Sequence, residues 1–172
     1  GSRIRRVGHG ALSFDLALGP EYDLTHPIVH GIIRGWITSG CIAGVMLATQ
    51  CSSWSRARHG PPGSSWGPLR SRQQPLGLPN LLAHDKTKVL LGNKQMRNTS
   101  HIIALCNKFS VPCFLENPDS SMLFYAPAIA RLCRLPSATR ICSDQCQFGT
   151  RWRKRTRFML WNCCGTSDLD VR

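Results

Sequence analysis

The chain has 172 residues and a mass of 19.1 kDa, which suits a single domain, residues 1–172, with one substantial core. Its 22 Lys and Arg against 9 Asp and Glu give a formal net charge of +13, which favours a nucleic acid as partner over a merely solvated basic surface. No apolar stretch is long enough to span a bilayer and no signal peptide is evident, so we expect an intracellular protein with no membrane partner.

Nine cysteines are an odd number for a set of disulfides, and several lie in apolar runs where reduced cysteine behaves as a small hydrophobe. We therefore expect free thiols. A zinc site made of Cys142, Cys146, Cys163 and Cys164 is the less favoured alternative, because adjacent cysteines seldom ligate one ion. The sequence predicts no metal centre.

The amino-terminal part of the chain predicts a strand, a helix and a second strand. Residues 11–16 are typical of a short strand, which Asp15 closes. Apolar residues recur at helical spacing over residues 27–38, and a proline at the first of these positions is well placed to begin a helix. The apolar run 41–48 then predicts a strand that stops shortly before Cys51.

The middle of the chain predicts a loop, a helix and a strand. Residues 59–79 are rich in Gly, Pro, Ser and Arg, which is typical of a lid or a substrate-contacting arm. A long helix is expected over 85–109, and the apolar run 111–115 predicts a strand that ends at Glu116. Ligands bind at the carboxyl edge of an α/β sheet, so the Cys51 thiol and this acid form a candidate site.

The carboxyl-terminal part predicts a short helix over 127–135, a strand or extended segment over 139–148 and a final strand over 157–163. Strands that alternate with helices predict a doubly wound α/β sheet. The fold class expected from the residues alone is therefore α/β.

A basic segment with an aromatic residue precedes the final strand. Arginine and lysine bind phosphates and an aromatic ring stacks on a base, so the segment predicts a nucleic-acid surface. Trp54 and Trp66 are further candidates for stacking. The expected nucleic-acid contacts are Arg56, Arg58, Arg151, Trp152, Arg153 and Lys154.

In chain order, these residues resemble the motifs of the cytosine-5 DNA methyltransferases, and more closely the divergent methyltransferase-like domains with a Cys-Ser-x-Ser-x-Ala-Arg type loop. The matching elements are Cys51, Glu116-Asn117, Phe148-Gly149 and Arg155-x-Arg157. The resemblance implies a Rossmann-like methyltransferase sheet and S-adenosyl-L-methionine as methyl donor. It also implies DNA rather than RNA as partner, and a nuclear location if the source is eukaryotic.

The resemblance implies a catalytic group of four residues. The thiolate of Cys51 would add to C6 of cytosine, and Glu116 would face N3 and stabilise the charge that builds in the ring. Arg157 would face O2, with Arg155 as its neighbour and fallback. A lone cysteine at a strand end is also compatible with a packed structural residue.

Two carboxylates match acids that the family uses on the cofactor. Asp15 corresponds to the acid on the ribose hydroxyls and Asp23 to the acid that accepts from the adenine amino group. Each has a structural alternative: Asp15 as the end of a strand, and Asp23 as a cap of the helix that begins near residue 27.

The sequence departs from the family before and after these motifs. No apolar strand and glycine-rich loop precede Asp15, so we expect an amino-terminally truncated sheet with an unpaired edge beside the strand before Cys51. We also expect no separate target-recognition domain after Arg157. The predicted function is DNA cytosine-5 methyl transfer, and the alternative is a catalytically inactive methyltransferase-like module that binds nucleic acid through its basic surface.

Overall fold

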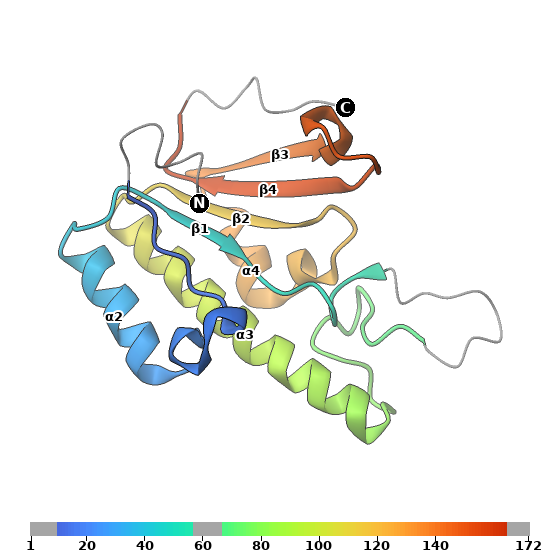
Figure 1. Cartoon of the computed structure of the whole chain (residues 1–172). Coiled ribbons are helices and arrows are strands. Elements are labelled where there is room, and N and C mark those ends of the chain that lie inside the picture. The colour runs from blue at the N-terminus through green and yellow to red at the C-terminus, as the bar shows by residue number, and fades with distance from the viewer. Residues whose placement is uncertain (1–9, 57–66, 165–172) are drawn as a thin grey trace.

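The computed structural model describes residues 10–56 and 67–164, which form a mixed sheet covered by helices (Figure 1). The sheet order is β1-β2-β4-β3. β1 and β2 run parallel, and β4 runs antiparallel to both of its neighbours, so the fold is α/β as expected. The strands are β1 (Val45–Ala48), β2 (Cys113–Pro118), β3 (Ala138–Asp144) and β4 (Arg155–Trp161).

In the described part of the chain, the α-helices are α2 (Pro27–Thr38), α3 (Ala83–Lys108) and α4 (Pro127–Leu132). α2 begins with Pro27, and the Nδ1 atom of the preceding His26 accepts a hydrogen bond from the Ile28 amide at 3.3 Å. Its buried residues, Val29, Ile33 and Ile37, recur every four positions and so form one apolar stripe.

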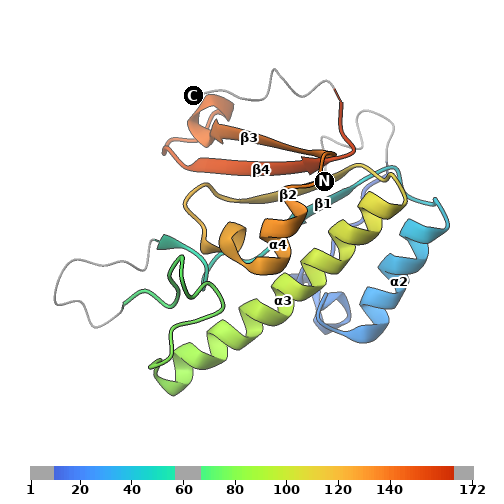
Figure 2. The same ribbon diagram turned by 180° about the vertical axis from the view of Figure 1, so that it is seen from behind.

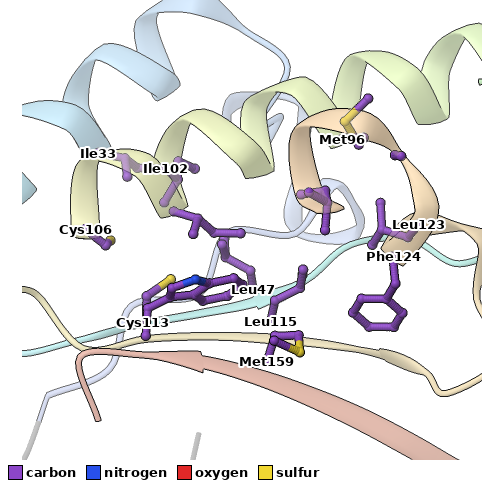
Figure 3. Close-up of a cluster of buried hydrophobic side chains, with 14 of the residues drawn as sticks. Ile33, Leu47, Met96, Ile102, Cys106, Cys113, Leu115, Leu123, Phe124 and Met159 are labelled. Carbon is purple, nitrogen blue, oxygen red and sulfur yellow. The ribbon is translucent and has the colours of Figure 1, made fainter. Parts of the chain in front are cut away.

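The hydrophobic core lies between the helices and one face of the sheet (Figure 3). Side chains alternate along β2, and Cys113 and Leu115 point into the core with Met159, the register partner of Leu115 on β4. α3 contributes Ile102 and Cys106 from the opposite side. The packing of α3 on β2 therefore places the carboxyl ends of β1 and β2 near the middle of this long helix.

The described helices all lie on one face of the sheet (Figures 1 and 2). The doubly wound arrangement that we predicted is therefore not found in residues 10–56 and 67–164. The reason is that β4 returns antiparallel beside β3 through a short connection, whereas a parallel return would need a helical crossover. The opposite face carries Phe114, Glu116 and Phe158, which are half-buried.

Most of the predicted elements are confirmed with shifts at their ends. The largest shift is in the strand expected over 41–48, because β1 begins only at Val45. The helices expected over 85–109 and 127–135 are α3 and α4, and the helix expected over 27–38 has these bounds. The final strand begins two residues earlier than predicted. The segment expected as strand or extended over 139–148 is β3 followed by a 3-10 turn, η5 (Gln145–Phe148).

The strand predicted over 11–16 is wrong. Asp15 instead caps a 3-10 turn, η1 (Leu16–Leu18), by accepting from the Ala17 amide at 3.0 Å. The centre of the Phe14 ring lies 5.9 Å from the ring centres of Tyr22 and of Trp36. These aromatic side chains, and not a neighbouring strand, therefore cover the Phe14 ring.

β1 lies at the end of the sheet, and no strand pairs with its outer side among the described residues. The unpaired edge expected beside the strand before Cys51 is therefore confirmed for this part of the chain. No helix of residues 10–56 and 67–164 has the length and apolar character needed to cross a membrane.

Candidate functional site

The candidate site lies at the edge of the sheet where β1 and β2 end. The two parallel strands finish together, because Ala48 is the register partner of Glu116, and Cys51 follows three residues after Ala48. β4 begins at the same edge, where Thr156 pairs with Pro118. The segments that carry Cys51 and Glu116 therefore lie at the same edge as the connection between β3 and β4. Figure 1 shows the ends of β1 and β2 and this connection on the same side of the sheet.

The turn that carries Cys51 is anchored to its surroundings. The Cys51 carbonyl accepts hydrogen bonds from the amides of Trp54 and Ser55, at 2.9 and 2.8 Å. Just before it, the Thr49 carbonyl accepts from the side-chain nitrogen of Asn117 at 2.6 Å, and the Thr49 hydroxyl lies 2.8 Å from that of Thr99 on α3. β2 and α3 therefore fix the backbone that presents the half-buried Cys51.

A buried arginine that sequence reasoning did not find locks this turn from behind. Arg70 is 2% exposed, and its guanidinium lies 3.4 Å from the centre of the Trp54 ring. Its five hydrogen bonds, as many as a guanidinium has N–H groups, all reach neutral oxygens. The acceptors are the Ser53 carbonyl and hydroxyl, the carbonyls of Pro75 and Val89, and Asn93 Oδ1.

The contacts of Arg70 decide what this cluster does. Burial lowers the pKa of the guanidinium to about 10, so it remains charged at neutral pH. Because its donors are saturated, the cluster is a structural support rather than a ligand site. Trp54 is fully buried, which rules it out as a base-stacking surface, while Trp66 lies outside the described residues. The sequence signal for this support was the isolated Gly92 within the predicted helix, where glycine is unfavourable relative to alanine by about 1 kcal/mol.

Glu116 lies on the face of the sheet opposite the helices. Its carboxylate forms an ion pair with Lys154, with 3.5 Å between Oε1 and Nζ. Its neighbour Asn117 points toward the helices and is fully buried, and Asn117 Oδ1 has no hydrogen-bond partner. The strand end thus presents an acid on one face and a buried amide on the other.

The two arginines of the Arg-x-Arg motif are bound to Asp119, a residue that the sequence analysis did not single out. Arg157 Nε donates to Asp119 Oδ1 at 2.8 Å, and Arg155 Nε donates to Oδ2 at 3.3 Å. Arg140 of β3 joins them at 3.1 Å from Oδ1. Burial acts to raise the pKa of Asp119, but the hydrogen bond and charge of Arg157 hold it below its ordinary value.

The structure does not bring Arg157 and Glu116 together. Arg157 pairs in register with Asn117, whereas Glu116 pairs with Phe158, so the acid and the guanidinium point to opposite faces of the sheet. Arg157 is also largely covered, with a side chain 16% exposed and lying 4.4 Å from the Phe124 ring centre. Glu116, Arg157 and Arg155 therefore do not form the clamp around one base that the resemblance implies.

The connection between β3 and β4 carries the predicted basic surface. Trp152 is 64% exposed and Arg151 is exposed beside it. Arg153 is exposed, and its Nε donates to the buried Asp144 at 2.8 Å, which orients its guanidinium group. Exposed aromatic and basic side chains thus lie together in this connection.

The two basic residues expected after Cys51 are described only in part. Arg56 is exposed, and Arg58 lies outside the described residues. Two hollows of about 150 and 390 Å³ are lined by residues between 73 and 93, and the larger one also by Pro127, but neither includes Cys51 or Glu116.

The two acids assigned to the cofactor differ in their surroundings. Asp23 is half-buried and accepts from the Thr25 amide and hydroxyl at 2.8 and 2.9 Å, and the backbone hydrogen bond from Thr25 chiefly lowers its pKa. The side-chain nitrogen of Asn98 on α3 donates to the Leu24 carbonyl at 2.6 Å, which holds this segment against α3. Asp15 is exposed and ends no strand.

The described residues do not fit the whole of S-adenosylmethionine. The hydrogen bonds from Thr25 orient the Asp23 carboxylate. Its oxygens can accept further hydrogen bonds, so Asp23 is suited to bind an amino or hydroxyl group of the cofactor. No strand and glycine-rich loop precede Asp15 within residues 10–15, so nothing there cradles the methionine part. Asp23 also does not cap α2, whose N-cap is His26.

No group of three or more His, Cys, Asp or Glu within the described ranges is arranged to hold a metal ion. Cys142 is buried opposite Arg157 in the middle of β3, and Cys163 lies beyond the far end of β4. The four cysteines of the zinc alternative are therefore spread along the length of the sheet.

The comparisons with known proteins return no match: no family model, no curated protein and no solved structure is significantly similar to the chain.

Proposed function

We propose that the chain is a methyltransferase-like domain that binds nucleic acid, DNA in preference to RNA, along the carboxyl edge of its sheet. The observation that carries the proposal is the position of the exposed Trp152 and Arg151, which stand at the edge where Cys51 and Glu116 also lie. An exposed ring beside guanidinium groups suits bases and phosphates. A DNA partner implies an intracellular location, the nucleus in a eukaryote.

The sheet topology supports the methyltransferase-like part of this proposal. By the resemblance, β1 and β2 correspond to the fourth and fifth strands, which are adjacent and parallel in a doubly wound sheet. β4 corresponds to the last strand, and its antiparallel insertion between β2 and β3 is similar to the reversed strand of a methyltransferase sheet. The order β1-β2-β4-β3 therefore suits one half of such a sheet.

The distribution of charge supports a polyanionic partner. The chain has a formal net charge of +13. Among the basic residues at this edge, Arg153 forms an ion pair with Asp144, Lys154 forms one with Glu116, and Arg151 is exposed. When basic side chains bind phosphates, counterions are released from the nucleic acid, which favours binding. A side chain that an ion pair already orients loses less conformational entropy in this step.

The proposal is tested by measuring the binding of a short single-stranded DNA, of the duplex with the same sequence and of the corresponding RNA. Replacing Trp152→Ala removes a stacking surface, so we expect weaker binding by about 1–3 kcal/mol, which is roughly 5- to 150-fold in Kd. Arg151→Gln should reduce the slope of log K against log salt by about one. Arg34→Gln, an exposed charge on α2, is the matched control and should act less. Unchanged affinity in the Trp152 variant would contradict the proposal.

Methyl transfer through the Cys51 thiol is the second candidate function, in which Asp23 would hold one part of S-adenosylmethionine. The observation that favours it is that the half-buried Cys51 thiol, on an anchored turn, follows β1 at the sheet edge where β2 ends with Glu116. The placement of Arg155 and Arg157 on Asp119 favours binding alone. The test measures methyl transfer to the same DNA together with DNA affinity. Transfer that is lost in Cys51→Ala and kept in Cys41→Ala, with DNA affinity unchanged in both variants, would establish the enzyme.

A further inference from the structure

Three guanidinium groups converge on one carboxylate beside the candidate interface. Asp119 accepts from Arg157, Arg155 and Arg140, at 2.8, 3.3 and 3.1 Å. The Asp119 backbone takes part as well, because its carbonyl accepts from Arg157 at 3.0 Å and its amide donates to the Arg155 carbonyl at 3.1 Å. We call these four residues the Asp119 cluster.

The Asp119 cluster has an excess of charge and of donors. Its three guanidinium groups against one carboxylate leave a net charge of +2. Each guanidinium has five N–H groups, of which the carboxylate and one carbonyl occupy only a part. The Arg140 and Arg155 side chains are 53% and 35% exposed, so solvent reaches part of each. Arg140 also makes a side-chain hydrogen bond with Cys142.

The arginines of the Asp119 cluster are held in fixed positions. They lie on the face of β3 and β4 that bears the helices, since Arg140 pairs with Met159, and Arg157 pairs with Cys142. Arg157 is further held against the Phe124 ring. Asp144, which pairs in register with Arg155, forms a second ion pair on this face, with Arg153. Together with the Asp119 cluster, this makes four guanidinium groups and two carboxylates on the same part of β3 and β4.

We propose that the Asp119 cluster is a preorganised phosphate-binding site, with Arg140 and Arg155 binding the backbone of the nucleic acid and Asp119 holding them in position. Planar guanidinium groups match the oxygens of phosphate in pairs, and fixed donors lose little entropy on binding. The inference rests on the proposed function, and it extends the interface from the tip of the β3–β4 connection onto the face of these strands.

Asp119→Asn separates a built site from a merely basic surface. The variant raises the net charge by one, so a surface that acts only through its charge would bind a single-stranded DNA oligonucleotide more tightly. A preorganised site loses the carboxylate that orients the arginines, so we expect weaker binding of the same probe. Tighter binding would overturn the proposal. Circular dichroism and thermal unfolding establish that the variant is folded.

Arg140→Gln tests the cluster without touching its buried part, because the Arg140 side chain is largely exposed. We expect the slope of log K against log salt to fall by about one, with weaker binding of all sequences alike. Arg34→Gln removes the same charge from α2 and should leave that slope closer to the parent value. Equal effects of the two variants would overturn the proposal.

The two proposals fail in different ways. If DNA binds and Trp152→Ala weakens it while Arg140→Gln matches Arg34→Gln, the interface stands and the phosphate site is refuted. If the parent chain binds no nucleic acid, both proposals are refuted.

Discussion

At the scale of residues, the support behind the Cys51 turn depends on the absence of a side chain at Gly92. A Cβ atom there would lie 2.9 Å from the Arg70 guanidinium, 3.2 Å from Trp54 Nε1, and in steric conflict with the Ser53 hydroxyl. The glycine thus lets α3 approach the Trp54–Arg70 pair closely. A helix-interior glycine is unfavourable relative to alanine by roughly 1 kcal/mol, which close packing must offset here.

Gly92→Ala is therefore expected to lower the free energy of unfolding by about 1–3 kcal/mol, the typical cost of an overpacked core. Gly35→Ala, on α2, is the matched control, because a Cβ atom there meets nothing within 4 Å. The control should gain up to about 1 kcal/mol from helix propensity. Urea unfolding of both variants measures the difference, and equal stability of the two would contradict the packing argument.

At the scale of elements, β1 is a short strand held from one side. The Val45 amide donates to the Pro112 carbonyl at 2.9 Å, and the register pairs Val45 with Cys113. Successive backbone amides along a strand point in opposite directions. The Leu47 amide therefore also points toward β2, while the amides of Met46 and Ala48 point away from the sheet. β2 differs because it has a partner on each side.

Amide hydrogen exchange should reveal this asymmetry. We expect the amides of Met46 and Ala48 to exchange much faster than those of Leu47 and Leu115, since no strand of the described residues accepts from them. Exchange followed by NMR resolves the individual amides. Equal protection of Met46 and Leu47 would mean that another segment or a second copy of the chain covers the outer edge.

The helices were predictable because the information for them is local. In α2, a proline at the first position and apolar residues every three to four positions set both ends and the buried face. The strand predicted around Asp15 had apolar residues but no local signal for a partner, and its Phe14 found aromatic neighbours instead. A strand requires a pairing edge, which sequence periodicity does not specify.

At the scale of the whole molecule, the net charge predicts a polyanionic partner but not where it binds. Asp119 gathers three arginines, and Glu116 and Asp144 each hold one basic residue, all near the carboxyl edge of the sheet. Acids in a strongly basic chain thus order the positive charge at this edge. That order is what the Asp119→Asn and Arg140→Gln variants measure.

The sequence by itself determined the α/β class, the main helices and the meeting of Cys51 and Glu116 at one edge. These follow from local periodicity and from the rule that parallel strands end together. Only the tertiary structure decided the partners: Asp119 for the paired arginines, Arg70 for Trp54, and opposite faces for Glu116 and Arg157. Strand register sets the face of every side chain, and register depends on contacts between distant segments.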